Sequence, residues 1–222
     1  KFIKIKERNK MSMLKNLFSN NEEKAIDFYK AVEGRRSIYV LDKNVTVSEE
    51  RIIEVINHSV LHTPTSFNSQ TGRVVVLMGD KQDKLWNITM EALRKVVPAE
   101  AFKDTEDKIN MFKAAYGTVL FYEDQSIVRG LQEQFALYKD NFPVWSEQSA
   151  GILQNMVWTA LHVEGLGASL QHYNELIEEE VKKEFDIPQD WKLRAQMPFG
   201  NIVVPAGEKE FAPLIGRVRV LK

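Results

Sequence analysis

Residues 145–165 read WSEQSAGILQNMVWTALHVEG and form the most apolar stretch of the chain. Its apolar residues recur with helical spacing, which predicts a long helix that begins after Pro143. Gly165 and Gly167 follow where such a helix would end. Because apolar residues occur on nearly every side, we expect a central helix that is buried on several sides. The apolar positions are Ile152, Leu153, Met156, Val157, Ala160 and Leu161.

Four other helices are predicted from capping residues and apolar periodicity. One of them carries the stripe Ile52, Ile53, Ile56 and Val60, which has a helical period. The first helix is expected from a cap at Asn20 to a stop at Gly34, and the second begins at a capping box of Thr46 and Glu49. The third is expected from a cap at Asp80 up to Pro98, and a shorter fourth near 109–115.

Strands are expected at four places, and the chain shows no internal repeat and no separating linker. The first two are continuous apolar runs, which are typical of strands buried on both faces. The pattern therefore predicts one α+β domain. The strand ranges are 74–78, 118–122, 193–197 and 217–221.

Composition excludes several classes of function. The 222 residues include 30 basic and 31 acidic side chains, so no broad charge attracts nucleic acid or an anionic membrane. The absence of cysteine excludes disulfides, thiolate nucleophiles and cysteine-ligated metals. No apolar run approaches the roughly 20 residues of a membrane helix. We expect a cytoplasmic protein without nucleic-acid or membrane partners.

The first residues, KFIKIKERNK, have no apolar segment of the kind found in signal peptides. Met11 or Met13 is the expected natural start. Residues 1–10 are therefore expected to be an addition, and 11–222 to be the single domain.

Motifs for several common chemistries are missing. The sequence holds no glycine-rich dinucleotide loop, no GxxxxGK[ST] and no GxSxG. His58 and His62 have the spacing of zinc ligands on a helix, but no glutamate follows His58 and no third ligand is evident. We expect two partly exposed histidines and no metal site. His162, on the apolar helix, is expected to be a core histidine.

Three stretches are not explained by helix, strand or turn patterns alone. Residues 62–79 read HTPTSFNSQTGRVVVLMG and place a row of neutral hydrogen-bonding groups before a strand, more than a connection needs. Arg35, Arg36 and Ser37 follow a helix end, and guanidinium groups with a hydroxyl suit a phosphate, although arginine pairs are also common on surfaces. Residues 165–173 read GLGASLQHY, where small residues allow close backbone approach or simply end the helix.

These stretches occur in the order RRS, PTSFNSQ, GLGASLQHY and PFGNIVVPAGEKEF. This order resembles the FMN-dependent nitroreductase family, over nearly the whole chain from about Glu33 onward. Residues 141–174 resemble the subgroup of copper-induced and fatty-acid-repression-type nitroreductases. The resemblance implies an α+β sandwich with a mostly antiparallel central sheet flanked by helices. It also implies an intertwined homodimer with an FMN in each of two interface sites.

The resemblance further implies which residues bind FMN. The match to the phosphate and ribityl contacts comprises Arg35, Arg36, Ser37 and the late Lys209. The match to the loop that reaches the flavin of the other subunit comprises Pro64, Thr65, Ser66, Asn68 and Gln70. The match to the segment along the isoalloxazine ring comprises Leu170, Gln171 and His172. Tyr39 and Phe211 depart from the family, because many relatives have lysine and arginine there.

A flavin carries the hydride chemistry itself, so no catalytic side chain and no metal is expected. The resemblance implies an oxidoreductase that takes hydride from NADH or NADPH through flavin N5 and reduces nitroaromatic or quinone acceptors. One alternative is a non-enzymatic protein that binds FMN as a sensor or store. Another keeps the fold but changes the chemistry, for example to reductive dehalogenation.

Overall fold

The computed structural model describes residues 27–222 of the chain. The chain divides into two compact units, Lys1–Arg35 and Arg36–Lys222. In the first unit, α2 (Phe28–Gly34) is capped by Asp27, whose carboxylate accepts a hydrogen bond of 2.8 Å from the Tyr29 amide. A helix running without interruption from Asn20 was therefore wrong, and Asn20 itself lies outside the described residues.

The second unit is built on an antiparallel sheet. Its strands follow the order β1-β5-β3-β2, and the short β4 also pairs with β5. The first three predicted strands are confirmed, each as part of a longer one. The bounds are β1 (Leu41–Asp42), β2 (Gly72–Met78), β3 (Gly117–Asp124), β4 (Gly167–Ala168) and β5 (Trp191–Ile202).

The strand predicted at 217–221 is wrong. After β5 the chain continues from 203 to 222 without a helix or strand, and only an isolated bridge joins Ile215 to Val218. None of the described strands pairs with 217–221. An apolar run becomes a strand only where a neighbour satisfies its backbone groups, and this segment has no such neighbour within the described chain.

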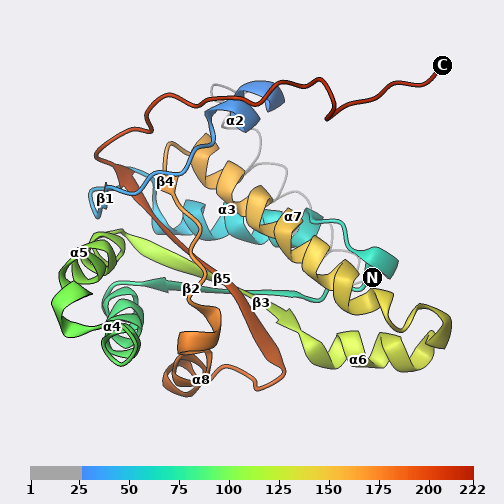
Figure 1. The fold of residues 1–222 in the computed structure, drawn as a ribbon, viewed down its shortest axis with the longest axis horizontal. Helices are drawn as coiled ribbons and strands as arrows, with labels where there is room; N and C mark the ends of the chain where they lie inside the picture. The colour runs from blue at the N-terminus through green and yellow to red at the C-terminus, as the bar shows by residue number, and fades with distance from the viewer. Residues whose placement is uncertain (1–26) are drawn as a thin grey trace, which may run out of the picture. The chain divides into compact units, whose positions relative to one another are not determined.

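Helices cover both faces of the sheet, as Figure 1 shows. One face is covered by α3 (Glu49–His62) and α7 (Asn141–Val163), and the other by α4, α5 and α8. This arrangement confirms the α+β sandwich. The remaining bounds are α4 (Asp80–Arg94), α5 (Phe102–Lys113), α6 (Gln125–Gln134), α8 (Asn174–Phe185), η2 (Ser66–Asn68), η3 (Ala99–Ala101) and η4 (Ala136–Tyr138).

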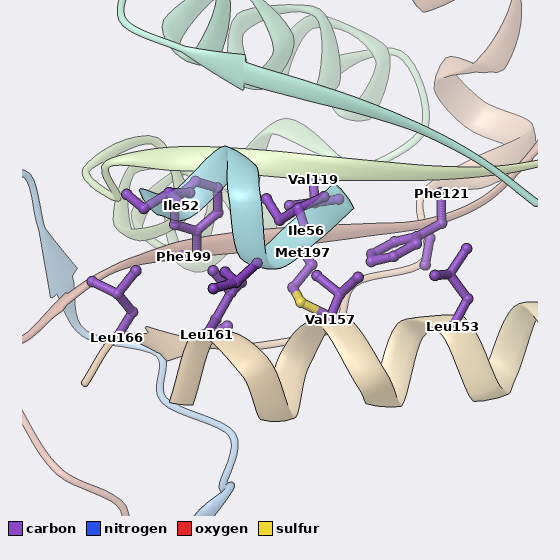
Figure 2. Close-up of a cluster of buried hydrophobic side chains, with 13 residues drawn as sticks. Ile52, Ile56, Val119, Phe121, Leu153, Val157, Leu161, Leu166, Met197 and Phe199 are labelled. Atoms are coloured by element: carbon purple, nitrogen blue, oxygen red, sulfur yellow. The ribbon is translucent and has the colours of Figure 1, made fainter. Parts of the chain in front are cut away.

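Strand β3 is buried along its whole length because alternate side chains enter two different cores. Val119 and Phe121 point toward α3 and α7, whereas Leu120 and Tyr122 belong to the core beneath α4 and α8. Figure 2 shows the first core, in which side chains of two helices and two strands meet. Its labelled members are Ile52, Ile56, Val119, Phe121, Leu153, Val157, Leu161, Leu166, Met197 and Phe199.

Two predicted helix starts need correction. Ser48, not Thr46, caps α3, since its Oγ accepts a hydrogen bond of 3.2 Å from the Arg51 amide. Gly79, with a φ of +56°, occupies the cap position of α4, so Asp80 is the first helical residue. A short polar side chain close to a helix start fits more than one register, and packing decides between them.

The predicted helix lengths and stripes also change. Helix α4 ends at Arg94, before Pro98, and α5 begins at Phe102 rather than near 109. On α3, Ile53 and Val60 of the predicted stripe are exposed. The face that packs on the sheet is formed by Ile52, Val55, Ile56 and Ser59.

Helix α7 begins at Asn141, two residues before Pro143. A proline is tolerated there because amides of the first turn need no intrahelical acceptor. Within the described chain α7 is buried on one side and not on several, with Val144 and Ile152 exposed. Gly165 follows the helix with a φ of +84°, as expected for a residue that ends it. The buried stripe is Phe142, Ser146, Ser149, Ala150, Leu153, Val157 and Leu161.

Candidate functional site

Ser37 pairs with Ala168 in a parallel bridge, and the Ile38 amide donates a hydrogen bond of 2.9 Å to the Ala168 carbonyl. Arg36 and Ser37 are half-buried beside this contact. The structure therefore brings the start of the second unit, which carries two residues of the RRS motif, against the segment that follows α7. Arg35 lies in the first unit, at the end of α2.

Gly167 is required by this close approach. A Cβ at position 167 would lie 2.8 Å from side-chain atoms of both Leu41 and Ile202, and 3.0 Å from the Ile38 Cβ. Contacts under 3.0 Å force the neighbours to move, so only glycine allows the two segments to pack in this way. Of the two alternatives that the sequence left open, Gly167 thus serves the close approach of two backbone segments, whereas Gly165 ends α7.

The segment 170–172 is fixed by its backbone. Gln171 exchanges two backbone hydrogen bonds with Gln196 of β5, of 2.7 and 2.9 Å. The Gln171 side chain is buried and donates to the Ser169 hydroxyl at 3.1 Å. Leu170 is half-buried and His172 is exposed. The result is a short, firmly held ledge on which Leu170 and His172 remain accessible.

The loop between α3 and β2 has a strained backbone. Phe67, Asn68 and Gln70 have positive φ angles of 58°, 50° and 48°. Each such non-glycine residue costs about 1–2 kcal/mol. The Thr65 hydroxyl accepts a hydrogen bond of 3.0 Å from the Gln70 amide and closes the loop. Strain of this kind persists where surrounding contacts enforce it and is common at functional sites.

Aromatic packing is one of those contacts, and the sequence interpretation missed it. The Phe67 ring lies 5.1–5.9 Å, between ring centroids, from four other aromatic rings. Phe67 is still 52% exposed. The signal was visible as a lone aromatic within a polar loop, but its partners are distant in sequence. They are Phe135, Tyr138, Phe142 and Trp145.

Arg73 fixes the other end of the loop. Its Nη1 donates to the carbonyls of Gln70 and Gly72 at 2.8 and 2.9 Å. Its Nη2 donates to Asp124 at 3.1 Å. Pro64, Asn68 and Gln70 are exposed, and Thr65 and Ser66 are half-buried.

The loop and the Ser37–Ala168 contact lie at opposite ends of the sheet. The loop leads into Gly72, which pairs with Glu123 of β3. Ala168 instead pairs with Phe199, which lies opposite Gly117 at the far end of the same strand. On β2 these two levels are marked by Gly72 and by Met78, which pairs with Gly117. They are six residue steps apart, which corresponds to about 20 Å along the strands. The described chain does not bring these two predicted groups of residues together.

The remaining predicted residues are on the surface. Lys209 lies in the exposed C-terminal segment, with its ammonium 5.0 Å from the Phe211 ring. His58 and His62 are exposed on α3 with ring centroids 4.3 Å apart. In residues 27–222, no three side chains of His, Cys, Asp or Glu are grouped as metal ligands. His162 is half-buried, so its prediction as a core residue was wrong.

Glu123 is a buried acid that the sequence did not single out. Burial is the main cause that raises the pKa of Glu123, whereas the hydroxyls of Ser146 and of nearby Thr71 act in the opposite direction. Tyr122 and Tyr173 also have raised pKa values because they are buried.

No described helix is both long enough and apolar enough to cross a membrane.

Comparison with known proteins places these features in context. Residues 32–201 match the model of the nitroreductase family. The chain is 32% identical over 187 residues to the nitroreductase FRM2 of Saccharomyces cerevisiae, covering 83% of this chain and 93% of FRM2.

Solved structures agree with this match. The nitroreductase CinD of Lactococcus lactis, in complex with nicotinic acid, superimposes with a TM-score of 0.83 and 54% identity, covering 88% of this chain and all of CinD. A protein of Exiguobacterium sibiricum solved with FMN is 15% identical, covers 90% of this chain and 99% of its own, and shares the fold with a TM-score of 0.65. These matches confirm the resemblance drawn from the sequence.

Proposed function

Because this chain belongs to the nitroreductase family, we propose that it is an FMN-dependent oxidoreductase that oxidises NADH or NADPH and reduces nitroaromatic or quinone acceptors. The observation that carries the proposal is the pairing of Ser37 with Ala168. This pairing places Arg36 and Ser37, whose side chains suit a phosphate, beside the segment that leads into residues 170–172. That segment is held by its backbone, and Leu170 and His172 on it are accessible. CinD, at 54% identity, has been solved with chloramphenicol and with 4-nitrophenol, which supports nitroaromatic acceptors here.

The side chains present fit FMN in their chemistry. Arg35, Arg36 and Lys209 are cations and Ser37 supplies a hydroxyl, a donor set that suits a phosphate. We assign the backbone of Leu170, Gln171 and His172 to the edge of the flavin ring, since that segment is held in place by Gln196. Bound FMN would supply the hydride transfer between the nucleotide and the acceptor. The chain's own task is to anchor, orient and shield it.

We further propose that two chains combine to form each site. The loop residues Pro64, Thr65, Ser66, Asn68 and Gln70 would reach the flavin held by Arg35, Arg36 and Ser37 of a second copy. Support comes from the distance within one chain between the loop before β2 and the Ser37–Ala168 contact, which is about 20 Å along the strands. A second copy removes the need for one chain to span that separation.

Exposed apolar side chains support the homodimer. Monomers rarely leave large contiguous apolar patches in water. Here such side chains occur on α3, on α7 and throughout the segment after β5, which leaves the sheet at its end (Figure 1). They are Ile53, Val60, Leu61, Val144, Ile152, Val203, Val204, Phe211, Leu214, Ile215, Val218, Val220 and Leu221.

Steady-state kinetics test the proposed function. Oxidation of NADH and of NADPH is followed with nitrobenzene, with a benzoquinone and without acceptor. The proposal expects acceptor-dependent oxidation of at least one nucleotide by the FMN-loaded protein. If FMN binds but neither nucleotide is consumed with any acceptor, the protein is a sensor or store and the proposal fails.

A further inference from the structure

Gln196 is a polar side chain in the middle of a buried stretch of β5. Residues 195–199 of this strand are all buried, and Gln196 has no exposed surface. It pairs with Leu120 of β3, whose side chain enters the apolar core beneath α4 and α8. A glutamine is tolerated in such a place only when its amide oxygen and nitrogen both have hydrogen-bond partners.

Both groups of the Gln196 side chain bind the residues that directly follow the ledge, residues 170–172. Its Oε1 accepts a hydrogen bond of 2.8 Å from the Tyr173 amide. Its Nε2 donates to Asn174 Oδ1 at 2.7 Å. Because a backbone amide can only donate, the Tyr173 contact determines which end of the side chain is the oxygen. The Gln196 side chain therefore has one defined orientation.

Gln196 also holds the ledge through its backbone. It exchanges backbone hydrogen bonds of 2.7 and 2.9 Å with Gln171. His172 thus lies between two attachments to the same residue, one at Gln171 and one at Tyr173. On its other side, Tyr173 is fixed by its carbonyl, which accepts a hydrogen bond of 3.2 Å from the Ile177 amide of α8. The backbone of His172 is therefore restrained from both directions.

The backbone groups of the ledge point alternately to two sides, as in other extended segments beside a strand. The Gln171 amide and carbonyl bond to β5. The Ala168 carbonyl points the opposite way and accepts from the Ile38 amide. By this alternation, the backbone groups of Leu170 and His172 point to the side of Ile38, and they bond to no other described residue. The ledge thus presents its open donors and acceptors on the side where the RRS motif lies.

Such a row of backbone groups suits a flat ring with nitrogen and oxygen atoms on its rim. The proposed function assigns these groups to the edge of the flavin. Reduction adds negative charge to the ring, so a hydrogen-bond donor at that edge stabilises the reduced form more than the oxidised form. The direction in which the ledge amides point therefore affects the midpoint potential of the bound cofactor.

We propose that Gln196 is a positioning residue for the flavin. Its side-chain amide holds Tyr173 and thereby sets the direction of the Leu170 and His172 backbone groups toward the ring. Gln196 is itself fully buried, so it acts only through the ledge. This inference rests on the proposed function, because it concerns the ring that the ledge would meet.

Gln196→Met tests the proposal, since it removes both side-chain hydrogen bonds and nearly keeps the volume. The first readout is hydrogen exchange of the Tyr173 amide, followed by NMR on the full chain as purified. Exchange should become about 2- to 12-fold faster, the range of one neutral hydrogen bond. The second readout is the midpoint potential of bound FMN, titrated with dithionite against a reference dye. This potential should fall, because the ledge donors lose their alignment.

Gln82→Met is the matched control. Gln82 of α4 is also fully buried, and its Nε2 donates to the Phe112 carbonyl at 3.0 Å, with no hydrogen bond to the ledge or to Tyr173. Any effect of deleting a buried amide as such is common to both variants. Gln82→Met should therefore leave the Tyr173 exchange rate and the FMN potential unchanged.

A second variant covers the case in which Gln196→Met does not fold. Asn174 is the half-buried first residue of α8, and Asn174→Ala removes the acceptor that orients Gln196 Nε2. It should change both readouts in the same direction as Gln196→Met, and it then decides alone.

Faster exchange together with a lower potential, both absent in Gln82→Met, supports the proposal. A potential that does not fall while Tyr173 exchanges faster makes Gln196 a structural residue only and overturns it. An equal fall in Gln82→Met also overturns it. A wild type that binds no FMN contradicts the proposed function and this inference together. Because dithionite replaces NADH and NADPH, a wild type that binds FMN but oxidises neither nucleotide contradicts the proposed function alone.

Discussion

The Ile38 amide lies 2.9 Å from the Ala168 carbonyl and donates a hydrogen bond to it. This bond holds together two segments that are 130 residues apart in the sequence, since 168 minus 38 is 130. One segment follows the arginine pair and the other leads into Leu170, Gln171 and His172. The proposed cofactor site depends on this contact.

Gly167→Ala should disturb that contact. Its Cβ would clash with Leu41 and Ile202, and overpacking of this kind costs about 1–3 kcal/mol. We expect a lower free energy of unfolding in urea and weaker FMN binding. Gly130→Ala on α6 is the control, because its Cβ would meet nothing within 4 Å, and it should be stabilising by up to about 1 kcal/mol. Equal stability of the two variants would show that the close approach at Gly167 is not needed.

Arg35→Ala should weaken FMN binding if the guanidinium contacts the phosphate. A hydrogen bond to a charged group contributes about 1.5–3 kcal/mol, which corresponds to roughly 10- to 150-fold in affinity. The dissociation constant is measured by flavin fluorescence, and excess FMN should restore turnover. Arg129→Ala, which removes an exposed arginine paired with Asp190, is the control and should bind FMN normally. Unchanged affinity in Arg35→Ala would make Arg35 an ordinary surface residue.

Subunit mixing tests whether each site is shared. One chain carries Arg35→Glu and the other Asn68→Lys, and each homodimer is expected to be inactive. If the loop acts across the interface, a mixed dimer collects both changes in one site and leaves the other intact, so activity returns. Co-expressed, doubly tagged mixed dimers that are no more active than the two homodimers would contradict the proposal that each site is shared.

The pH dependence of stability should report on Glu123. Its pKa in the folded protein is raised above the ordinary value of 4.5. The folded state therefore holds its proton more tightly, and the resulting stability is complete below pH 4.5 and lost as pH rises through the folded pKa. Glu123→Gln cannot ionise, so its stability relative to the wild type should increase over that rise. Urea unfolding at a series of pH values measures this, with the exposed Glu179→Gln as control. Parallel curves for wild type and Glu123→Gln would contradict a raised pKa of Glu123 in the folded protein.

Much of the fold could be predicted because local pattern and packing agree. The continuous apolar run in β3 arises because Val119 and Leu120 serve opposite cores, and this run was readable as a doubly buried strand. The helix caps were less certain, since Thr46 and Ser48 carry equivalent hydroxyls and only packing selects Ser48. The 217–221 run failed because a strand depends on a partner that the sequence does not specify.

The site was predicted through its motifs and not through its geometry. Ser37 and Ala168 could be linked only by resemblance, because nothing local in either segment encodes their pairing. Glu123 was missed because a glutamate is ordinarily a surface residue, and its burial is set by α7 and β2 packing around it. The aromatic partners of Phe67 come from residues 135–145. Only the tertiary fold brings that stretch close to the loop, so the sequence alone does not reveal the contact.

Anaerobic absorbance spectroscopy of the purified protein tests the central claim most directly. The account predicts a yellow protein whose released cofactor is FMN, whose flavin absorbance bleaches on adding NADH or NADPH, and whose absorbance returns on adding nitrobenzene. A colourless protein that does not take up added FMN would contradict the account. So would bound FMN that neither nucleotide reduces.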